Sequence, residues 1–133
     1  MTKIAVIIPA FNEVHSIGKV VAAIPNTVYK IVVVDNASTD ATAQVAESHG
    51  AVVLHEKQKG YGYACLKGIA HLQEDPPEIV VFLDGDYSDY PEQLTEIIRP
   101  IVSDNIDFVN NTVLLWQVRF YDVNTVFFGD NFL

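Results

Sequence analysis

Two aspartates separated by one glycine, Asp84 and Asp86, are the sharpest chemical feature of this 133-residue sequence. They directly follow the apolar run Ile79 to Leu83, which predicts a buried strand. Residues two apart in an extended backbone point the same way, and Gly85 lets the chain turn tightly. Two carboxylates placed in this way can hold Mg²⁺ or Mn²⁺ and present it to a diphosphate. The alternative is a polar turn after a strand, and the spacing alone favours neither.

A second acidic segment follows the apolar run Lys30 to Val34. Asp35 comes directly after that run, where its carboxylate could accept a hydrogen bond from a base or a ribose hydroxyl. Ser38, Thr39 and Asp40 suit the start of the next helix, and for Asp40 this capping role is the favoured one.

The first apolar run leads into a loop that contains Asn12 and Glu13. Both side chains also have a simpler explanation, because asparagine is a good N-cap and glutamate suits the positive end of a helix. Lys57 and Lys59 are the clustered cations near the same predicted edge, where they could contact a phosphate or lie in a solvated loop. The following G-Y-G is not a Rossmann fingerprint, because it comes after the third strand and lacks the remaining spacing. The histidines show no metal-ligand spacing and are expected at the surface or at caps: His15, His49, His55 and His71.

An alternation of apolar and amphipathic segments predicts how these loops come together. Nearly continuous apolar runs predict strands covered on both faces: Lys3 to Ile8, Lys30 to Val34, Ala51 to Leu54, and Ile79 to Leu83. Amphipathic segments predict four helices: from about Val14 to Ile24, from just after Asp40 to a close at Gly50, from about Tyr63 to Leu72, and from Pro91 onward. This order predicts an α/β fold with a doubly wound, mostly parallel sheet, whose ligands bind beyond the carboxyl ends of the strands.

The pattern changes after Asn105. Ile106 to Val109 predicts a fifth strand, and Thr112 to Tyr121 with Thr125 to Phe128 predicts a hairpin. We therefore expect one domain over residues 1–110, followed by an atypical aromatic-rich tail over residues 111–133. The tail either pairs with a second copy, which would give a homodimer, or folds back on its own sheet, and self-association is slightly favoured.

Composition excludes one class of partner. The formal net charge is −9, which argues against nucleic acid. It would also repel a phosphorylated ligand, and a bound divalent cation is the usual solution. Cys65 is the single cysteine, so the sequence predicts a reducing compartment. The start does not resemble a signal peptide, and no apolar run is long enough to span a bilayer. We expect a cytoplasmic protein, with peripheral contact to a membrane left open.

Four segments together resemble the family 2 glycosyltransferases of GT-A fold. The resemblance is strongest to the branch that contains dolichol-phosphate mannose and polyprenyl-phosphate glucose synthases. The segments are Ile7 to Glu13 (IIPAFNE), Val33 to Asp40 (VVDNASTD), Lys59 to Gly62 (KGYG) with Ala64, and Phe82 to Asp86 (FLDGD). Each is weak alone, but four in the right order, each at a strand end, are a specific signal over about residues 1 to 110.

The resemblance implies a role for each matching residue. The loop after the first strand would line the nucleoside pocket, with Glu13 near the ribose: Pro9, Ala10, Phe11, Asn12 and Glu13. Asp35 would contact the base or ribose, and Lys59 and Gly60 would border the donor site. Asp84, Gly85 and Asp86 would form the D-x-D motif of the family.

The resemblance also implies a reaction. A sugar passes from a UDP- or GDP-sugar to an acceptor hydroxyl or phosphate, with a polyprenyl phosphate among the options. Mg²⁺ or Mn²⁺ would be held by Asp84 and Asp86, of which Asp86 is the better candidate for direct ligation.

The sequence departs from the family after Asp107-Phe108-Val109, where Asn110-Asn111-Thr112 replaces the usual G-[S/T]-R. No catalytic base can be assigned, since no motif supports Asp122 or Asp130. A truncated, non-catalytic nucleotide-sugar-binding module is therefore the main alternative.

Two other enzyme classes fit less well. A HAD-type phosphatase has its D-x-D after the first strand and Thr or Val where Ser88 stands. A sugar-phosphate nucleotidyltransferase needs a glycine-rich loop after the first strand, where this chain has Pro9 to Glu13.

Overall fold

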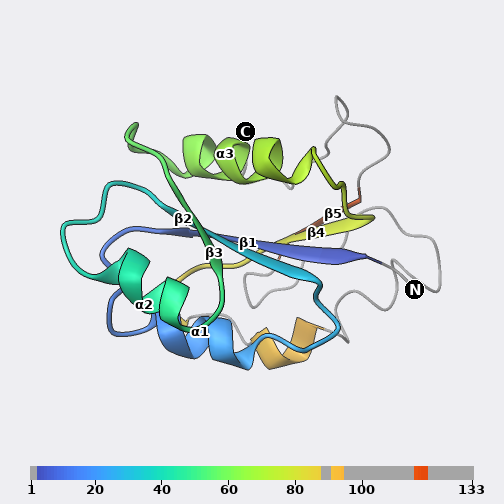
Figure 1. Ribbon diagram of the computed structural model, residues 1–133, viewed down its shortest axis with the longest axis horizontal. Coiled ribbons are helices and arrows are strands. Elements are labelled where there is room, and N and C mark those ends of the chain that lie inside the picture. The colour runs from blue at the N-terminus through green and yellow to red at the C-terminus, as the bar shows by residue number, and fades with distance from the viewer. Residues whose placement is uncertain (1–2, 88–90, 95–115, 120–133) are drawn as a thin grey trace.

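The computed structural model describes residues 3–87, 91–94 and 116–119. Strands and helices alternate in these ranges (Figure 1). The elements are β1 (Ile4–Ala10), α1 (Ile17–Ala23), β2 (Lys30–Asp35), α2 (Thr42–Ser48), β3 (Val52–His55), α3 (Tyr61–Leu72), β4 (Ile79–Phe82), the 3₁₀ helix η1 (Pro91–Gln93) and β5 (Trp116–Arg119).

The strands form one sheet in the order β3-β2-β1-β4-β5. The first four are mutually parallel, and β5 pairs antiparallel with β4. The prediction of a mostly parallel α/β sheet is therefore confirmed. Figure 1 shows α3 on one face of this sheet and α1 with α2 on the other.

The alternation of side chains along β1 explains why both faces can be covered. Val6 and Ile8 pack with α1 in one apolar cluster, whereas Ala5 and Ile7 pack with α3 in the other. Successive strand residues point to opposite faces, so an unbroken apolar run supplies both cores. The strands were predicted from such runs, and the observed bounds differ from the predicted ones by at most two residues.

The helix starts differ more from the prediction than the strands do. The first helix begins at Ile17 rather than near Val14, and the third begins at Tyr61, slightly before the predicted start. The fourth predicted helix begins at Pro91, and the 3₁₀ helix η1 of the structure begins at the same residue. The predicted strand over residues 106–109 and most of the predicted hairpin and tail lie outside the described residues. The described part of the tail, Trp116–Arg119, forms β5 and pairs with β4, so this segment folds back on its own sheet.

Gly68 allows α3 to pack closely on β1. A Cβ atom at this position would lie 2.8 Å from Cγ2 of the buried Ile7. We expect Gly68→Ala to lower the free energy of unfolding by roughly 1–3 kcal/mol, because overpacking forces the two elements apart. Urea unfolding measures this change.

Gly62 provides a matched control in the same helix. A Cβ atom there meets nothing within 4 Å, so Gly62→Ala should raise the free energy of unfolding by about 0.5–1 kcal/mol. Equal effects of the two substitutions would contradict the packing explanation.

Candidate functional site

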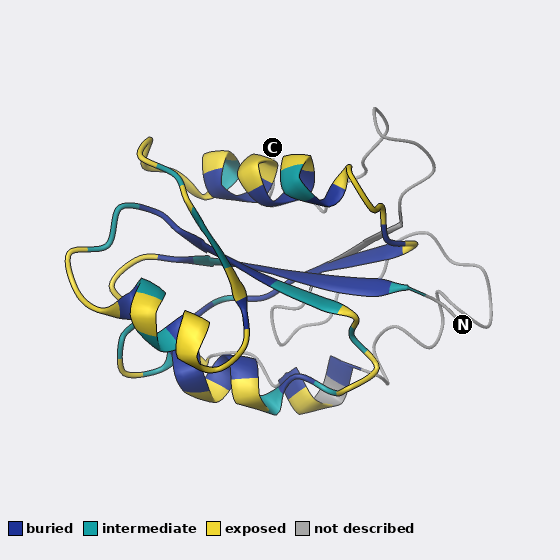
Figure 2. Cartoon of the chain, viewed as in Figure 1, coloured by how far each residue is buried: buried dark blue, intermediate teal, exposed yellow. Residues whose placement is uncertain are grey.

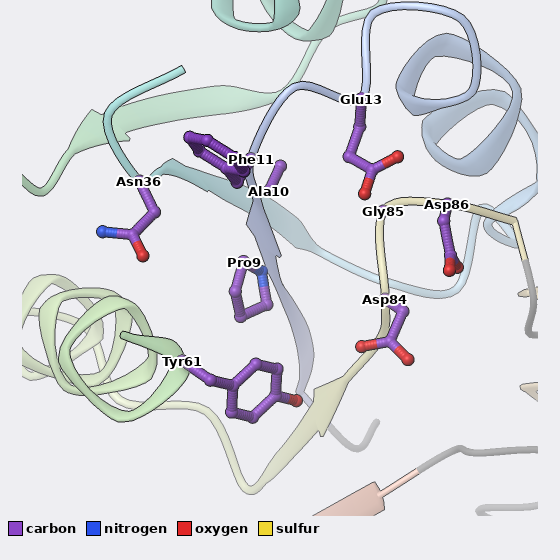
Figure 3. Close-up of a pocket in the computed structure, with 9 residues that line it drawn as sticks. All are labelled: Pro9, Ala10, Phe11, Glu13, Asn36, Tyr61, Asp84, Gly85 and Asp86. Atoms are coloured by element: carbon purple, nitrogen blue, oxygen red, sulfur yellow. The ribbon is translucent and has the colours of Figure 1, made fainter. Parts of the chain in front are cut away.

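The loops at the carboxyl ends of β1 and β4 meet in a pocket of about 360 Å³. Parallel pairing of these strands brings the loops together, and it continues one step further because the N–H of Leu83 donates to the carbonyl of Ile7. Figure 3 shows the lining side chains. They are Pro9, Ala10, Phe11, Glu13, Asn36, Tyr61, Asp84, Gly85 and Asp86.

The pocket has two chemically different sides (Figure 3). Phe11, Asn36 and Tyr61 lie on one side, and Asp84 and Asp86 lie on the other. An aromatic and amide side can contact a planar heterocycle, whereas an acidic side can hold a cation.

Hydrogen bonds between the first two loops fix the rim of the pocket. Asn12 Oδ1 accepts the N–H of Thr39 at 2.8 Å, while the N–H of Asn12 donates to Ser38 Oγ at 2.9 Å. The N–H of Glu13 donates to Thr42 Oγ1 at 2.9 Å. Asn12 has a φ of 52°, a conformation that asparagine tolerates better than most residues. Asn12 therefore joins two loops, which explains why it neither lines the pocket nor caps α1.

Asp35 and Asp40 also have structural partners in these loops. Asp35 is 7% exposed, its Oδ1 accepts the N–H of Ser38 at 3.1 Å, and its Oδ2 lies 3.4 Å from His55 Nδ1. Asp40 accepts both the N–H and the hydroxyl of Thr42, the first residue of α2. The hydroxyl contact lowers the pKa of Asp40. Asp40 thus has the helix-start role expected of it, and Asp35 lies beside the pocket without lining it.

Asn36 anchors the loop that leads into α3. Its Nδ2 donates to the carbonyls of Glu56 and Gln58 at 3.0 and 2.9 Å, and its Oδ1 accepts the N–H of Gly60 at 3.0 Å. Asn36 is 8% exposed, so these bonds are well shielded from water. The N–H of Asn36 donates to the carbonyl of Ala10, which holds Asn36 at the end of β1.

The predicted site omitted Asn36 and Tyr61 as binding residues. Both stand inside the recognised motifs, one directly after Asp35 and the other directly after Gly60. Their position in a matching segment was the only signal in the sequence. Lys59 and Gly60 lie outside the lining: Lys59 Nζ is 4.4 Å from the ring centroid of Phe11, and Gly60 is bonded to Asn36.

The acidic side of the pocket carries mutually repelling groups. Burial raises the pKa of Asp84, and the nearby charge of Asp86 raises it further. Burial also raises the pKa of Glu13, which a hydrogen bond from Ser16 partly offsets. The charges of Asp86, Asp40 and Asp84 then raise the pKa of Glu13 further. Clustered carboxylates of this kind favour a bound cation.

A hydroxyl group joins the first loop to the aspartate turn. Ser16 Oγ lies 2.7 Å from the carbonyl oxygen of Gly85 and 3.2 Å from Glu13 Oε2, so it can donate to either acceptor. This contact holds the turn of residues 84–86 against the start of α1.

The carboxylate oxygens that the pocket offers suit a metal ion whose remaining ligands come from a bound molecule. Within residues 3–87, 91–94 and 116–119, no group of three or more His, Cys, Asp or Glu side chains could hold a metal by itself. Mg²⁺ is commonly bound by one or two carboxylates together with substrate phosphates and water. Asp84 and Asp86 fit this arrangement. No helix in the described part of the chain is long and apolar enough to cross a bilayer.

The family model described as "Glycosyl transferase family 2" matches residues 5–123 of this chain. An uncharacterised glycosyltransferase of Mycobacterium tuberculosis is 42% identical over 96 residues, which cover 71% of this chain and 43% of that protein. The UDP-N-acetylglucosamine–dolichyl-phosphate N-acetylglucosaminyltransferase of Methanococcus voltae is 29% identical over 125 residues, covering 80% of this chain and 50% of that protein.

Solved structures show the same fold. Glucosyl-3-phosphoglycerate synthase from M. tuberculosis, crystallised with Mn²⁺, UDP and glucosyl-3-phosphoglycerate, superposes with a TM-score of 0.70 and 27% sequence identity. The match covers 80% of this chain and 42% of that one. The expected GT-A fold is confirmed, and the chain spans less than half the length of both M. tuberculosis proteins.

Proposed function

The chain belongs to glycosyl transferase family 2, and we propose that it binds a nucleotide-diphosphate sugar and takes part in transferring the sugar to an acceptor. The observation that carries this proposal is the pocket itself. It combines the loop after β1 with the acidic turn after β4, and its aromatic side is separate from its acidic side. In this proposal, residues 1–110 form the donor-binding half.

The nucleoside lies on the aromatic side. Phe11 and Tyr61 are both partly exposed there, so each offers an aromatic surface to a base. Pro9 and Ala10 form the floor between the two sides, and Glu13 lies toward the ribose. Asp35, Lys59 and Gly60 act from beside the pocket: Asp35 on the nucleoside, and the other two at the border of the donor.

The diphosphate lies on the acidic side, against the turn that contains Gly85. Asp84 and Asp86 hold Mg²⁺ or Mn²⁺, and Asp86 is the direct ligand. The metal, when bound, neutralises the diphosphate and stabilises it as a leaving group. The chain itself positions the two aspartates that would hold the metal, because Ser16 binds the carbonyl of Gly85 between them. Solved structures of glucosyl-3-phosphoglycerate synthase contain UDP with Mn²⁺ or Mg²⁺, which supports this assignment.

The donor is a UDP- or GDP-sugar, and the acceptor is a hydroxyl or a phosphate group. A lipid phosphate is one acceptor of this kind, and the printed name of the M. voltae relative includes dolichyl phosphate. The location we propose is the cytoplasm, with peripheral membrane contact as an option, since the single Cys65 cannot form an intramolecular disulfide and this favours a reducing compartment.

A non-catalytic binding module is the second proposal. It is favoured by the departure from the family pattern at Asn110-Asn111-Thr112, after which no motif supports a catalytic base. Assays with labelled UDP- and GDP-sugars in Mn²⁺ test both proposals. Release or transfer of sugar supports the transferase, whereas binding without turnover supports the module. Absence of binding to every nucleotide sugar would contradict both.

A substitution at Asp35 tests which part of the donor this residue contacts. We expect Asp35→Asn to weaken nucleoside and nucleotide-diphosphate binding by the same factor, equivalent to about 1–3 kcal/mol, because a charge-assisted hydrogen bond is lost. Calorimetry with uridine, guanosine, UDP and GDP measures both affinities. A loss confined to the diphosphates would show that the assignment is wrong.

A further inference from the structure

One segment of the chain has a charge opposite to that of the whole. The protein contains 17 acidic residues and 8 lysines and arginines, yet residues 57–72 contain three lysines and no acidic residue. Glu56 precedes this stretch and Glu74 follows it. The stretch therefore forms a local basic region that comprises the loop after β3 and the whole of α3.

The same segment exposes large apolar side chains. Leu66 is 54% exposed, Tyr63 is 46% exposed and Tyr61 is 43% exposed. The opposite side of α3 is buried against the sheet through Ala64, Cys65, Gly68, Ile69 and Leu72. Tyr63 and Leu66 are spaced three apart, so they share the outer side of the helix with Lys67.

The figures place the loop and the outer side of the helix together. Figure 2 shows the exposed side of α3 turned away from the sheet, with the exposed loop before it at the same edge of the molecule. The helices α1 and α2 lie on the other face of the sheet (Figure 1). A flat partner can therefore approach this side without meeting the acidic residues of α2, such as Glu47.

We propose that this surface docks on a lipid bilayer that contains anionic headgroups. The docking surface consists of Lys57, Lys59, Tyr63, Leu66 and Lys67. Its lysines attract lipid phosphates, its tyrosine suits the interfacial layer, and its leucine inserts below the headgroups. Charge complementarity selects an anionic bilayer over a neutral one. Acids on the far face of the sheet are screened, because the Debye length is about 8 Å at physiological ionic strength.

The docking surface adjoins the pocket. Tyr61 lines the pocket from the first turn of α3, two residues before Tyr63 of the docking surface, and Lys59 of that surface lies over the ring of Phe11. A docked bilayer would lie beside the opening of the pocket. The use of this position for a lipid-phosphate acceptor rests on the proposed function, whereas docking itself does not.

Vesicle binding by the whole chain, without nucleotide or sugar, tests the proposal. Vesicles of phosphatidylcholine alone are compared with vesicles that also contain phosphatidylglycerol, and the bound fraction is measured by sedimentation. We expect binding to the anionic vesicles only, with a marked decrease as salt is raised.

Charge reversal at Lys67 is the decisive variant. Each lysine near an anionic surface changes the partition coefficient about fivefold, so Lys67→Glu, which changes the charge by two units, should weaken binding roughly 25-fold. Lys19→Glu is the matched control, since Lys19 is an exposed residue of α1 on the other face of the sheet. The control should bind within about twofold of the unchanged protein.

Two variants at apolar positions test how much the insertion of a side chain into the bilayer contributes to binding. Leu66→Ser should weaken binding roughly threefold to tenfold, because a partly inserted side chain is lost. Val52→Ser, at an exposed position on β3, should have no effect. Circular dichroism establishes that all four variants keep their fold.

Several results would overturn the proposal. They are equal binding to neutral and anionic vesicles, equal losses in Lys67→Glu and Lys19→Glu, or no binding at all. The chain could also fail to bind vesicles while light scattering detects a dimer that Leu66→Ser dissociates. In that case the surface is an interface between two copies of the chain instead.

Discussion

Replacing Asp86 by alanine is expected to weaken the binding of UDP and GDP at least tenfold, to the affinity that the unchanged protein shows in EDTA. The physical reason is the arrangement of charges around the pocket. Glu13, Asp84 and Asp86 repel one another and would repel a diphosphate, so that ligand needs a cation between itself and the protein. Tenfold corresponds to about 1.4 kcal/mol, a modest value for the loss of one carboxylate ligand. Calorimetry in Mn²⁺, in Mg²⁺ and in EDTA provides the measurement.

Two controls separate the metal from the general effect of charge. Glu74→Ala removes an exposed carboxylate after α3, and it should leave the affinity for UDP and GDP unchanged. Uridine and guanosine, which lack phosphates, should bind Asp86→Ala as well as they bind the unchanged protein. An affinity for UDP that is identical in EDTA and in Mn²⁺ would contradict the role of the metal.

Replacing Asn36 by aspartate is expected to have the largest effect on stability. The new side chain keeps the shape of asparagine and can still accept the N–H of Gly60, but as a carboxylate it faces the carbonyls of Glu56 and Gln58. Two buried donors are replaced by a charge, so the free energy of unfolding should fall by about 2–4 kcal/mol at neutral pH. Urea unfolding measures this loss.

The same variant should also acquire a dependence on pH. Burial beside two carbonyls raises the pKa of the new carboxyl in the folded state above its value of about 3.9 in the unfolded state. The protonated form can donate to one carbonyl, so the loss is smallest below the unfolded pKa and grows as the pH rises through the folded one. Asn26→Asp, at an exposed position, should cost little at any pH. A loss in Asn36→Asp that does not change between pH 4 and pH 7 would contradict this explanation.

The sequence predicts the sheet better than it predicts the loops, and β1 shows why. The run Lys3 to Ile8 is apolar at every position from Ile4 onward, which is typical of a strand covered on both faces, and Val6 and Ile7 pack on opposite faces. That information is local. The strand order follows from general rules of handedness and connection, because alternating strands and helices leave few arrangements.

The site loops depend on contacts between segments that lie far apart in the chain. Asparagine is a residue type that suits an N-cap, but the side chain of Asn12 accepts the N–H of Thr39 and its backbone takes a left-handed conformation. Asp35 has the position of a ligand-binding residue, and the structure adds two partners that the sequence does not reveal, the N–H of Ser38 and the ring of His55. A pattern of residue types cannot reveal such partners, since each bond depends on how the strands bring the loops together.

The pairing of β1 with β4 has a consequence for how the site assembles during folding. Ile4 pairs with Ile79, so this contact closes a much longer loop than the pairing of Ala5 with Lys30 does. Long loops cost more entropy to close, and such contacts tend to form late. The aspartates therefore reach the loop after β1 only when the sheet is nearly complete. A ligand that bridges the loops after these two strands would bind the native state alone. It would therefore stabilise the native state, including the contact that forms last.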